Sequence, residues 1–199
     1  MKKKLAVISV LALCFAIAAG STLAYFTDSK TAHNVITSGG VGITVVETTK
    51  NPDGTEVEFP KDGITGVMPG TAVSKIVSVK NTGESEAWIR VKVDTSIKDA
   101  ENEPLSSSIK LSDGTSVDLV SFTVDNEKWT YNEKDGCYYY ADPVAAGEST
   151  AVLFSEVNFA PEMPNAYQNS TTIINVSAQA VQTANNGKTV MDATGWPEE

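Results

Sequence analysis

The chain has 199 residues and a formal net charge of −10, because 25 Asp and Glu residues outnumber 15 Lys and Arg residues. Three lysines, Lys2 to Lys4, stand at the start, so the part after residue 24 carries 12 basic and 25 acidic residues. A surface with this acidic excess repels nucleic acid and anionic lipid headgroups. Composition therefore excludes nucleic acid as an expected partner, and the length suffices for one domain with its own core.

The N-terminal stretch has the layout of a secretory signal peptide. Lys2 to Lys4 form a basic region, and Leu5 to Ala19 then carries no charge. This apolar run is short for a membrane-spanning helix, which needs about 20 apolar residues. Thr22 and Ala24 are small residues at the two positions that a signal peptidase reads, so the sequence predicts a signal helix over residues 1–24 and cleavage before Tyr25. The alternative is an uncleaved membrane anchor, which shares the basic flank and the apolar run.

Residues 25–40 are predicted to form a polar N-terminal arm that cannot bury much surface alone. Its apolar side chains, which could fill a groove offered by another element, belong to Phe26, Ala32, Val35 and Ile36. The arm ends in Gly39 and Gly40, and glycine adopts both signs of φ readily, so this pair is expected to be a flexible hinge. The alternative is a disordered or self-docked arm.

Residues 41–182 are predicted to form one domain of short strands. Branched residues over 41–48 indicate a first strand, and the turn at Asn51 to Gly54 returns the chain as a partner strand over 55–59. Further strands are expected over 71–80, 86–94, 119–124, 127–131, 137–141, 150–159 and 172–181. Apolar and polar residues alternate over 86–94 and 172–181, which directs one face of each strand into the core.

Two segments fall outside this pattern. Residues 97–114 are predicted as a long polar loop with a short helix or strand around 109–111, and residues 183–199 as a polar C-terminal tail that frays. Short strands separated by Gly, Pro and Asn turns, with almost no helical periodicity, predict an all-β fold. The expected architecture is an antiparallel, jelly-roll-like β-sandwich.

Cysteine usage adds no covalent support. Cys14 lies inside the signal peptide, so Cys137 is alone in the mature chain and no internal disulfide can form. Cys137 stands in a strand-like setting with no second thiol or histidine nearby in sequence to activate it. A half-buried structural thiol is therefore expected there, rather than a nucleophile.

Several strings of the chain carry a family resemblance. Thr22 to Asp28 (TLAYFTD) is followed by Asn34 to Ile36 and by Gly40 to Val45; further on stand Met68 to Gly70, Val77 to Gly83 and Trp88 to Val93. These strings resemble the N-terminus and the second and third core strands of the TasA and camelysin (CalY) family. Its members are exported proteins of Gram-positive bacteria, and a dedicated peptidase, SipW, cuts their signal peptides. The resemblance is most specific at the N-terminus and thin after Val93.

The resemblance implies a function for the arm. In this family the segment freed by cleavage acts as a donor strand, which inserts into the sheet of a neighbouring subunit and so builds a fibre. The chain is therefore expected to be a secreted structural protein of the extracellular (biofilm) matrix or cell surface. Other copies of the chain, the signal peptidase and an accessory matrix protein are the implied partners. The alternatives are a monomeric module that binds cell wall or glycans and a camelysin-like secreted metalloendopeptidase.

The sequence offers little chemistry for catalysis. His33, in the arm, is the one histidine, so neither a HExxH pair nor a histidine-based triad can form. No nucleophile and base stand at a recognisable spacing, and the glycines of residues 39–42 precede a predicted strand rather than a helix, unlike a phosphate-binding loop. We expect no enzyme activity and predict no catalytic, cofactor-binding or metal-binding residue.

Two further clusters have competing interpretations. The acidic residues of 125–127 and 133–136 could bind calcium if they meet across a hairpin, although acidic turns are usually just solvated. The aromatic side chains of Trp129, Tyr131 and Tyr138 to Tyr140 could form a glycan-binding patch. Cross-strand aromatic pairs that hold the hairpin together explain the same residues more simply and are favoured.

Overall fold

The computed structural model describes residues 27–28, 34–36 and 40–197. Within them the fold is all-β, with two large sheets, one small sheet and two short 3₁₀ helices, and no α-helix. The predicted signal peptide and its cleavage residues Thr22, Ala24 and Tyr25 lie outside the described residues. So do Phe26, Ala32 and Gly39 of the predicted arm and hinge.

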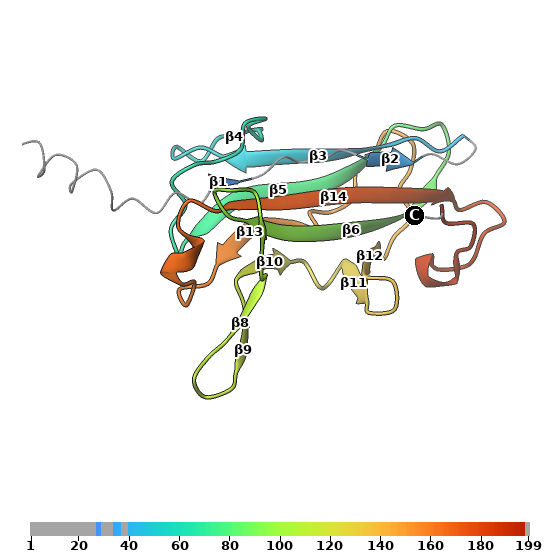
Figure 1. The fold of residues 1–199 in the computed structure, drawn as a ribbon. Helices are drawn as coiled ribbons and strands as arrows, with labels where there is room; N and C mark the ends of the chain where they lie inside the picture. Colours follow the sequence, from blue (N-terminus) through green and yellow to red (C-terminus); the bar gives the residue numbers. More distant parts are fainter. Residues whose placement is uncertain (1–26, 29–33, 37–39, 198–199) are drawn as a thin grey trace, which may run out of the picture.

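The larger sheet has seven strands and contains both the first and the last strand of the described residues (Figure 1). Its main order is β1, β14, β6, β12 and β11; β2 also pairs with β14, and β7 with β6. The bounds are β1 Thr27–Asp28, β2 Asn34–Ile36, β6 Ala87–Lys98, β7 Pro104–Leu105, β11 Trp129–Asn132, β12 Cys137–Tyr140 and β14 Thr171–Gln182. All its pairs are antiparallel except those of β1 and β2 with β14, which are parallel.

The second large sheet has five antiparallel strands in the order β10, β13, β5, β3 and β4. Their bounds are β3 Ile43–Lys50, β4 Glu56–Glu58, β5 Ala72–Asn81, β10 Val120–Val124 and β13 Phe154–Phe159. A separate hairpin, β8 Ser108–Lys110 and β9 Ser116–Asp118, projects from the body of the molecule (Figure 1). The 3₁₀ helices are η1 Asn165–Tyr167 and η2 Val190–Asp192.

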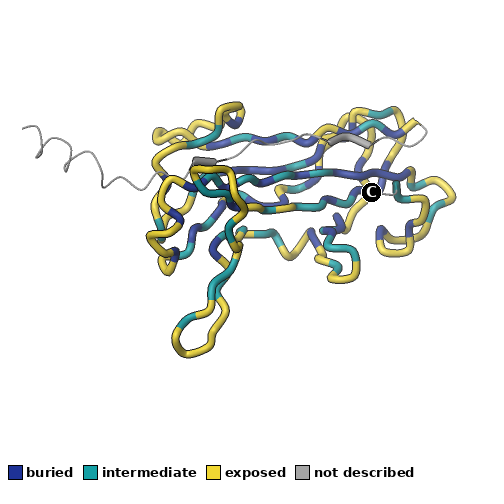
Figure 2. Tube along the Cα trace, in the orientation of Figure 1, coloured by how far each residue is buried: buried dark blue, intermediate teal, exposed yellow. Residues whose placement is uncertain are grey.

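The two large sheets share one hydrophobic core, an arrangement compatible with a β-sandwich. Strand β14 contributes Ile174, Val176 and Ala178, each fully buried, and β5 contributes Val77 and Val79 from the other sheet. Each such side chain stabilises the fold by about 1.5–3 kcal/mol, less for alanine. Figure 2 shows the buried stretches running along the long strands, with exposed residues gathered in the connections. The predicted core-facing residues of β6 and β14 are therefore confirmed, whereas Trp88, Gln179 and Val181 on the opposite face are buried as well.

The segment predicted as a long loop is mostly loop but also contains the end of β6 and two short strands. Strand β6 continues to Lys98, β7 pairs back on it, and β8 pairs with β9. The expected strand around 109–111 is present as β8, whereas β9 was not predicted. Its turn is fixed locally, because the Asp113 carboxylate accepts a hydrogen bond from the Thr115 backbone N–H at 2.8 Å.

The prediction of a frayed C-terminal tail is wrong. Residues 183–197, the C-terminal strap, fold back over the seven-stranded sheet and carry η2. The strap closes a second apolar cluster made of Trp88, Cys137, Tyr139, Val181, Val190 and Ala193, with Trp196 against it. Cys137 is 3% exposed in this cluster, so the thiol is buried rather than half-buried. The few apolar side chains of the strap are enough to order it, because they pack against apolar side chains that the sheet presents on this face.

Candidate functional site

The candidate site is the edge of β14 to which the arm attaches, here called the slot. Thr27 and Asp28 of β1 are the register partners of Thr171 and Thr172. Val35 and Ile36 of β2 are the partners of Ala178 and Gln179. The described part of the arm thus forms an outermost strand of the sheet and pairs with its own chain.

Strand β14 needs a neighbour on this edge. Its other edge is paired with β6 over its whole length, from Thr171 to Gln182. Apart from Thr172, its core-facing side chains are buried hydrophobics, and a long strand of this kind with unpaired N–H and C=O groups is a template for pairing with another chain. Among the described residues, only β1 and β2 cover this edge. If the arm left this edge, the unpaired backbone groups of β14 could pair with the arm of another chain.

The arm joins the domain through Gly40. This residue is exposed at φ +78°, and a Cβ there would meet no atom within 4 Å. Directly after it the chain is fixed, because the Gly42 carbonyl oxygen accepts the N–H groups of Thr82 at 2.7 Å and Gly83 at 2.9 Å. The backbones pack so closely that a Cβ on Gly83 would lie 2.5 Å from the Gly42 nitrogen. Gly40 is therefore the last described residue before the chain becomes fixed in the domain.

A buried asparagine holds this clamp. Asn81 is fully buried, its amide donates to the carbonyl oxygens of Ser85 and Val144 at 2.8 Å each, and its carbonyl oxygen accepts the Gly83 N–H at 2.9 Å. Sequence reasoning missed this role. The bonds to Gly83 and Ser85 are local, whereas the bond to Val144 forms only when segments far apart in sequence meet.

The interior beside the slot contains a buried ion pair. Lys75 is fully buried on the core-facing side of β5, and its Nζ lies 3.1 Å from Oε1 of Glu47 on β3. The ammonium also lies 3.8 Å from the ring centroid of Phe59. Sequence reasoning missed this pair. The signal was present, because Lys75 shares the alternation of Val73, Val77 and Val79, which places it among core positions.

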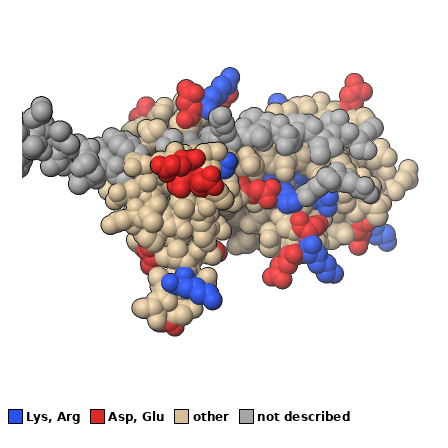
Figure 3. Space-filling model, viewed as in Figure 1, with Lys and Arg blue, Asp and Glu red and all other residues tan. Residues whose placement is uncertain are grey.

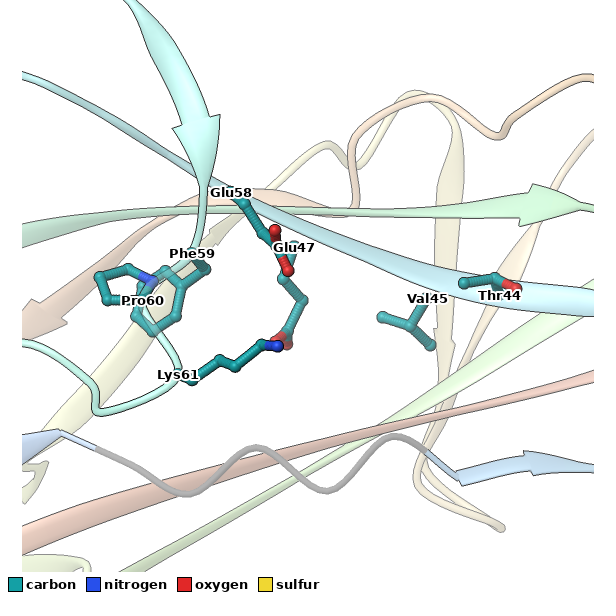
Figure 4. Close-up of a pocket in the computed structure, with 7 residues that line it drawn as sticks. All are labelled: Thr44, Val45, Glu47, Glu58, Phe59, Pro60 and Lys61. Atoms are coloured by element: carbon teal, nitrogen blue, oxygen red, sulfur yellow. The ribbon is translucent and has the colours of Figure 1, made fainter.

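A pocket of about 580 Å³ opens next to the ion pair. In Figure 4 the residues after β4 lie beside Glu47 of β3. The pocket is lined by Thr44, Val45, Glu47, Glu58, Phe59, Pro60 and Lys61. Four of these lining residues are polar or charged: Thr44, Glu47, Glu58 and Lys61.

Two buried hydroxyls lie at the start of β14. The Oγ of Ser170 and the Oγ1 of Thr172 are buried and have no hydrogen-bond partner. Farther along β14, the core-facing positions Ile174, Val176 and Ala178 are apolar. The slot therefore has a polar end, where β1 pairs, and an apolar end, where β2 pairs.

On the outer face of the seven-stranded sheet, polar side chains around Arg90 form a hydrogen-bond network. The Arg90 guanidinium donates to Gln179 at 2.8 Å, to Asp135 at 3.2 Å and to the hydroxyl oxygen of Tyr139 at 2.9 Å. The Trp196 ring lies 4.8 Å from the guanidinium carbon. Burial, followed by the hydrogen bond to Asp135, raises the pKa of Tyr139. Asp135, one of the acidic residues considered for calcium, is thus engaged by Arg90 and Tyr139.

Within residues 27–28, 34–36 and 40–197, no three His, Cys, Asp or Glu side chains are grouped to hold a metal ion. Asp125, in the other acidic cluster, accepts the Glu127 backbone N–H at 3.0 Å. The face in Figure 3 shows acidic and basic side chains interspersed, without a broad basic surface on the part not covered in grey.

The aromatic hairpin forms the favoured cross-strand pairs. Trp129 faces Tyr140 with ring centroids 5.0 Å apart, and Tyr131 faces Tyr138 at 4.8 Å. Only Tyr131 of this group is largely exposed, at 52%. One exposed ring gives little support to a glycan platform.

Comparison with known proteins identifies no relative: no protein-family model, no curated protein and no solved structure matches the chain. The described residues also contain no helix with the length and apolar character needed to span a membrane.

Proposed function

We propose that the chain is a secreted subunit of an extracellular matrix or cell-surface fibre, assembled by exchange of its N-terminal arm. One observation carries the proposal: β1 and β2 form the edge of the seven-stranded sheet and join the domain through one exposed glycine, Gly40. An element that completes a sheet through main-chain pairing can do so on its own chain or on a neighbour.

The strand order supports a jelly-roll topology with the arm as its first strand. Successive long strands alternate between the sheets: β5 and β6, β10 and β12, then β13 and β14. The first described strands lie beside the last strand, β14, although they pair with it in parallel, unlike the antiparallel pairs of a regular Greek key. A jelly roll that lacks these first strands is open along β14.

Exchange proceeds by rotation about Gly39 and Gly40, after which the arm enters the slot of the next subunit. The arm pairs with the same β14 residues whether it docks on its own chain or on a neighbour. Exchange of the arm alone therefore gains little free energy. Tethering gives the self-docked arm an effective concentration on the order of millimolar. Filaments therefore form when protein concentration is high or when neighbouring subunits add contacts. A contact between unlike surfaces that does not close generates a filament.

Export prepares the subunit for this step. Cleavage between Ala24 and Tyr25 by a signal peptidase releases the arm from the apolar N-terminal stretch, outside the cell. The acidic excess of the mature chain keeps it soluble before assembly.

A register-matched cysteine pair tests the proposal. In the mature chain beginning at Tyr25, Val35→Cys and Ala178→Cys stand at partner positions of the arm and β14. Oxidation of dilute monomer should lock the arm on its own chain and abolish filaments in electron micrographs until a reductant is added. Oxidation of preformed filaments should instead give a ladder of covalent oligomers on a non-reducing gel.

The matched control combines Val35→Cys with Ile174→Cys. These two positions are not register partners, so oxidation should give neither the locked monomer nor the covalent oligomers. If reduced and wild-type chains remain monomeric at every concentration, fibre assembly by this chain alone is wrong. The self-docked arm would then favour the monomeric binding module, to be assayed next against cell-wall polymers.

A further inference from the structure

We propose that Lys75 and Glu47 condense in the folded protein, so that an amide bond joins β5 to β3 in the interior. The Nζ of Lys75 lies 3.1 Å from Oε1 of Glu47, and the two side chains are 0% and 5% exposed. An amine and a carboxyl group in contact inside a core are a nucleophile and an acyl group that the proposed fibre assembly does not use. The inference goes beyond the proposed function and does not depend on it.

The first argument is the register of the two strands. Strands β3 and β5 are antiparallel neighbours, and Glu47 is the register partner of Val77. Lys75 stands two residues before Val77 and therefore on the same face of β5, so it is a diagonal neighbour of Glu47 across the strand pair. The strands are also tied beside the pair, because the Thr49 hydroxyl donates to the Ser74 carbonyl oxygen at 2.7 Å. The sheet itself therefore holds the two reacting groups together.

The second argument is proximity. Condensation of a free amine with a free carboxylic acid does not proceed far in water, because water is a product that is present in large excess. Two groups that a fold holds in contact react within one molecule, and effective molarities for well-oriented intramolecular reactions are on the order of 10⁵–10⁸ M. The contact of 3.1 Å between Nζ and Oε1 places the amine within reach of the carboxyl carbon bonded to that oxygen. Proximity thus favours the amide both in rate and at equilibrium.

The third argument is the cost of two buried charges. Removal of an ammonium and a carboxylate from water is unfavourable, and their attraction offsets this cost only in part unless further polar groups surround them. An amide is neutral, so condensation removes both charges at once. The surroundings are largely apolar, because the Phe59 ring centroid lies 3.8 Å from Nζ, and Val45 and Val77 are buried on the same faces of the two strands. Such surroundings favour the neutral product and exclude the water that would hydrolyse it.

The reaction needs no other reactant. A proton passes from the Lys75 ammonium to the Glu47 carboxylate across their contact, which leaves an amine and a carboxylic acid. The Nζ lone pair then forms a bond to the carboxyl carbon Cδ, the bond from Cδ to the hydroxyl oxygen breaks, and the hydroxyl leaves with a second proton of Nζ as water. The products are one amide and one water, with no oxidation or reduction, and the pocket lined by Glu47 gives the water a way out. Molecules that have not reacted keep the ion pair.

Mass spectrometry of the intact chain tests the inference. Mature protein beginning at Tyr25 is incubated in its folded state and then denatured for the measurement. Its mass should be lower than that of its sequence by one water molecule, and this deficit should grow with time after refolding. Trypsin should no longer cut after Lys75, so a digest should contain residues 31–50 joined to residues 62–80. A full mass at all times would overturn the inference.

The matched control combines Lys75→Met with Glu47→Leu, which removes both reacting groups and fills their space with apolar side chains. This variant, with its strand content checked by circular dichroism, should keep its full mass. Lys61→Met removes an amine that lines the same pocket and should retain the deficit. A deficit that persists in the double variant would come from another site, such as an Asp-Gly sequence, and would also overturn the inference. Neither result changes the fibre proposal, which electron microscopy of the same samples tests separately.

Discussion

The N-terminal arm and the C-terminal strap both cover the seven-stranded sheet, but they are held differently. The described arm extends the sheet at the edge of β14 through register pairing. The strap lies on the outer face and is held by side chains: the Trp88 indole donates to the Asn186 carbonyl oxygen at 2.9 Å, and Trp196 packs edge-on against Tyr139 at 5.8 Å. Main-chain pairing can be transferred to any chain with the same edge, whereas a set of specific side-chain contacts ties a segment to one place.

The largest expected effect concerns the interior beside the slot. Lys75→Met leaves Glu47 buried without its ion-pair partner and should lower the free energy of unfolding by about 3–5 kcal/mol. Urea denaturation followed by tryptophan fluorescence measures this. Lys75→Met combined with Glu47→Leu should recover most of the loss, and Lys80→Met, an exposed position of the same strand, should change little. Equal stability of Lys75→Met and wild type would show that the ion pair does not stabilise the fold.

The clamp behind the pivot comes next. Gly83→Ala forces a Cβ against the Gly42 backbone, which must shift, and should cost about 2–3 kcal/mol of unfolding free energy. Gly114→Ala provides the control for a glycine with positive φ and open space around the new Cβ. It should cost about 1 kcal/mol. If Gly83→Ala is no worse than Gly114→Ala, the close approach does not fix the pivot.

A substitution in the strap is expected to affect the strap and the cluster beneath it, but not the arm. Trp196→Ala removes an aromatic pair and a cation–π contact and should cost about 2 kcal/mol. Because the strap covers the cluster that contains Cys137, this variant should raise the rate at which a thiol reagent labels Cys137 in the native protein. Filament formation should persist, since the arm is untouched. Unchanged labelling would show that the strap does not shield the thiol.

The smallest effect is a pH dependence at β12, where Tyr139 faces the strap and Tyr138 packs against the main core. Burial raises the pKa values of Tyr138 and Tyr139 above the ordinary value of 10.0. Their contribution to stability is therefore complete below about pH 10, where both states hold the proton, and is lost as the pH rises through the folded-state pKa values. The urea concentration at the unfolding midpoint should decrease as the pH is raised above about 10, and Tyr138→Phe should reduce that decrease. A flat profile would contradict the burial of these hydroxyls.

By itself, the sequence determined the strand content. Alternation over 86–94 and 172–181, and turns such as Asn51 to Gly54, are local signals, and the structure has strands β6 and β14 and the β3–β4 hairpin at these places. The aromatic pairs of the hairpin at Trp129 could also be anticipated, because partners across a short turn are set by local register.

Only the tertiary structure decided how distant segments meet. Alternation predicts that Lys75 points inward, but it cannot identify Glu47, on a different strand, as the ion-pair partner. The polar sequence of the strap likewise does not indicate that Trp196 contacts Arg90. The edge position of the arm likewise depends on β14, more than a hundred residues away in the chain, being left open on one side. Such contacts depend on which strands become neighbours, and that choice follows from the burial of the whole core rather than from any local pattern.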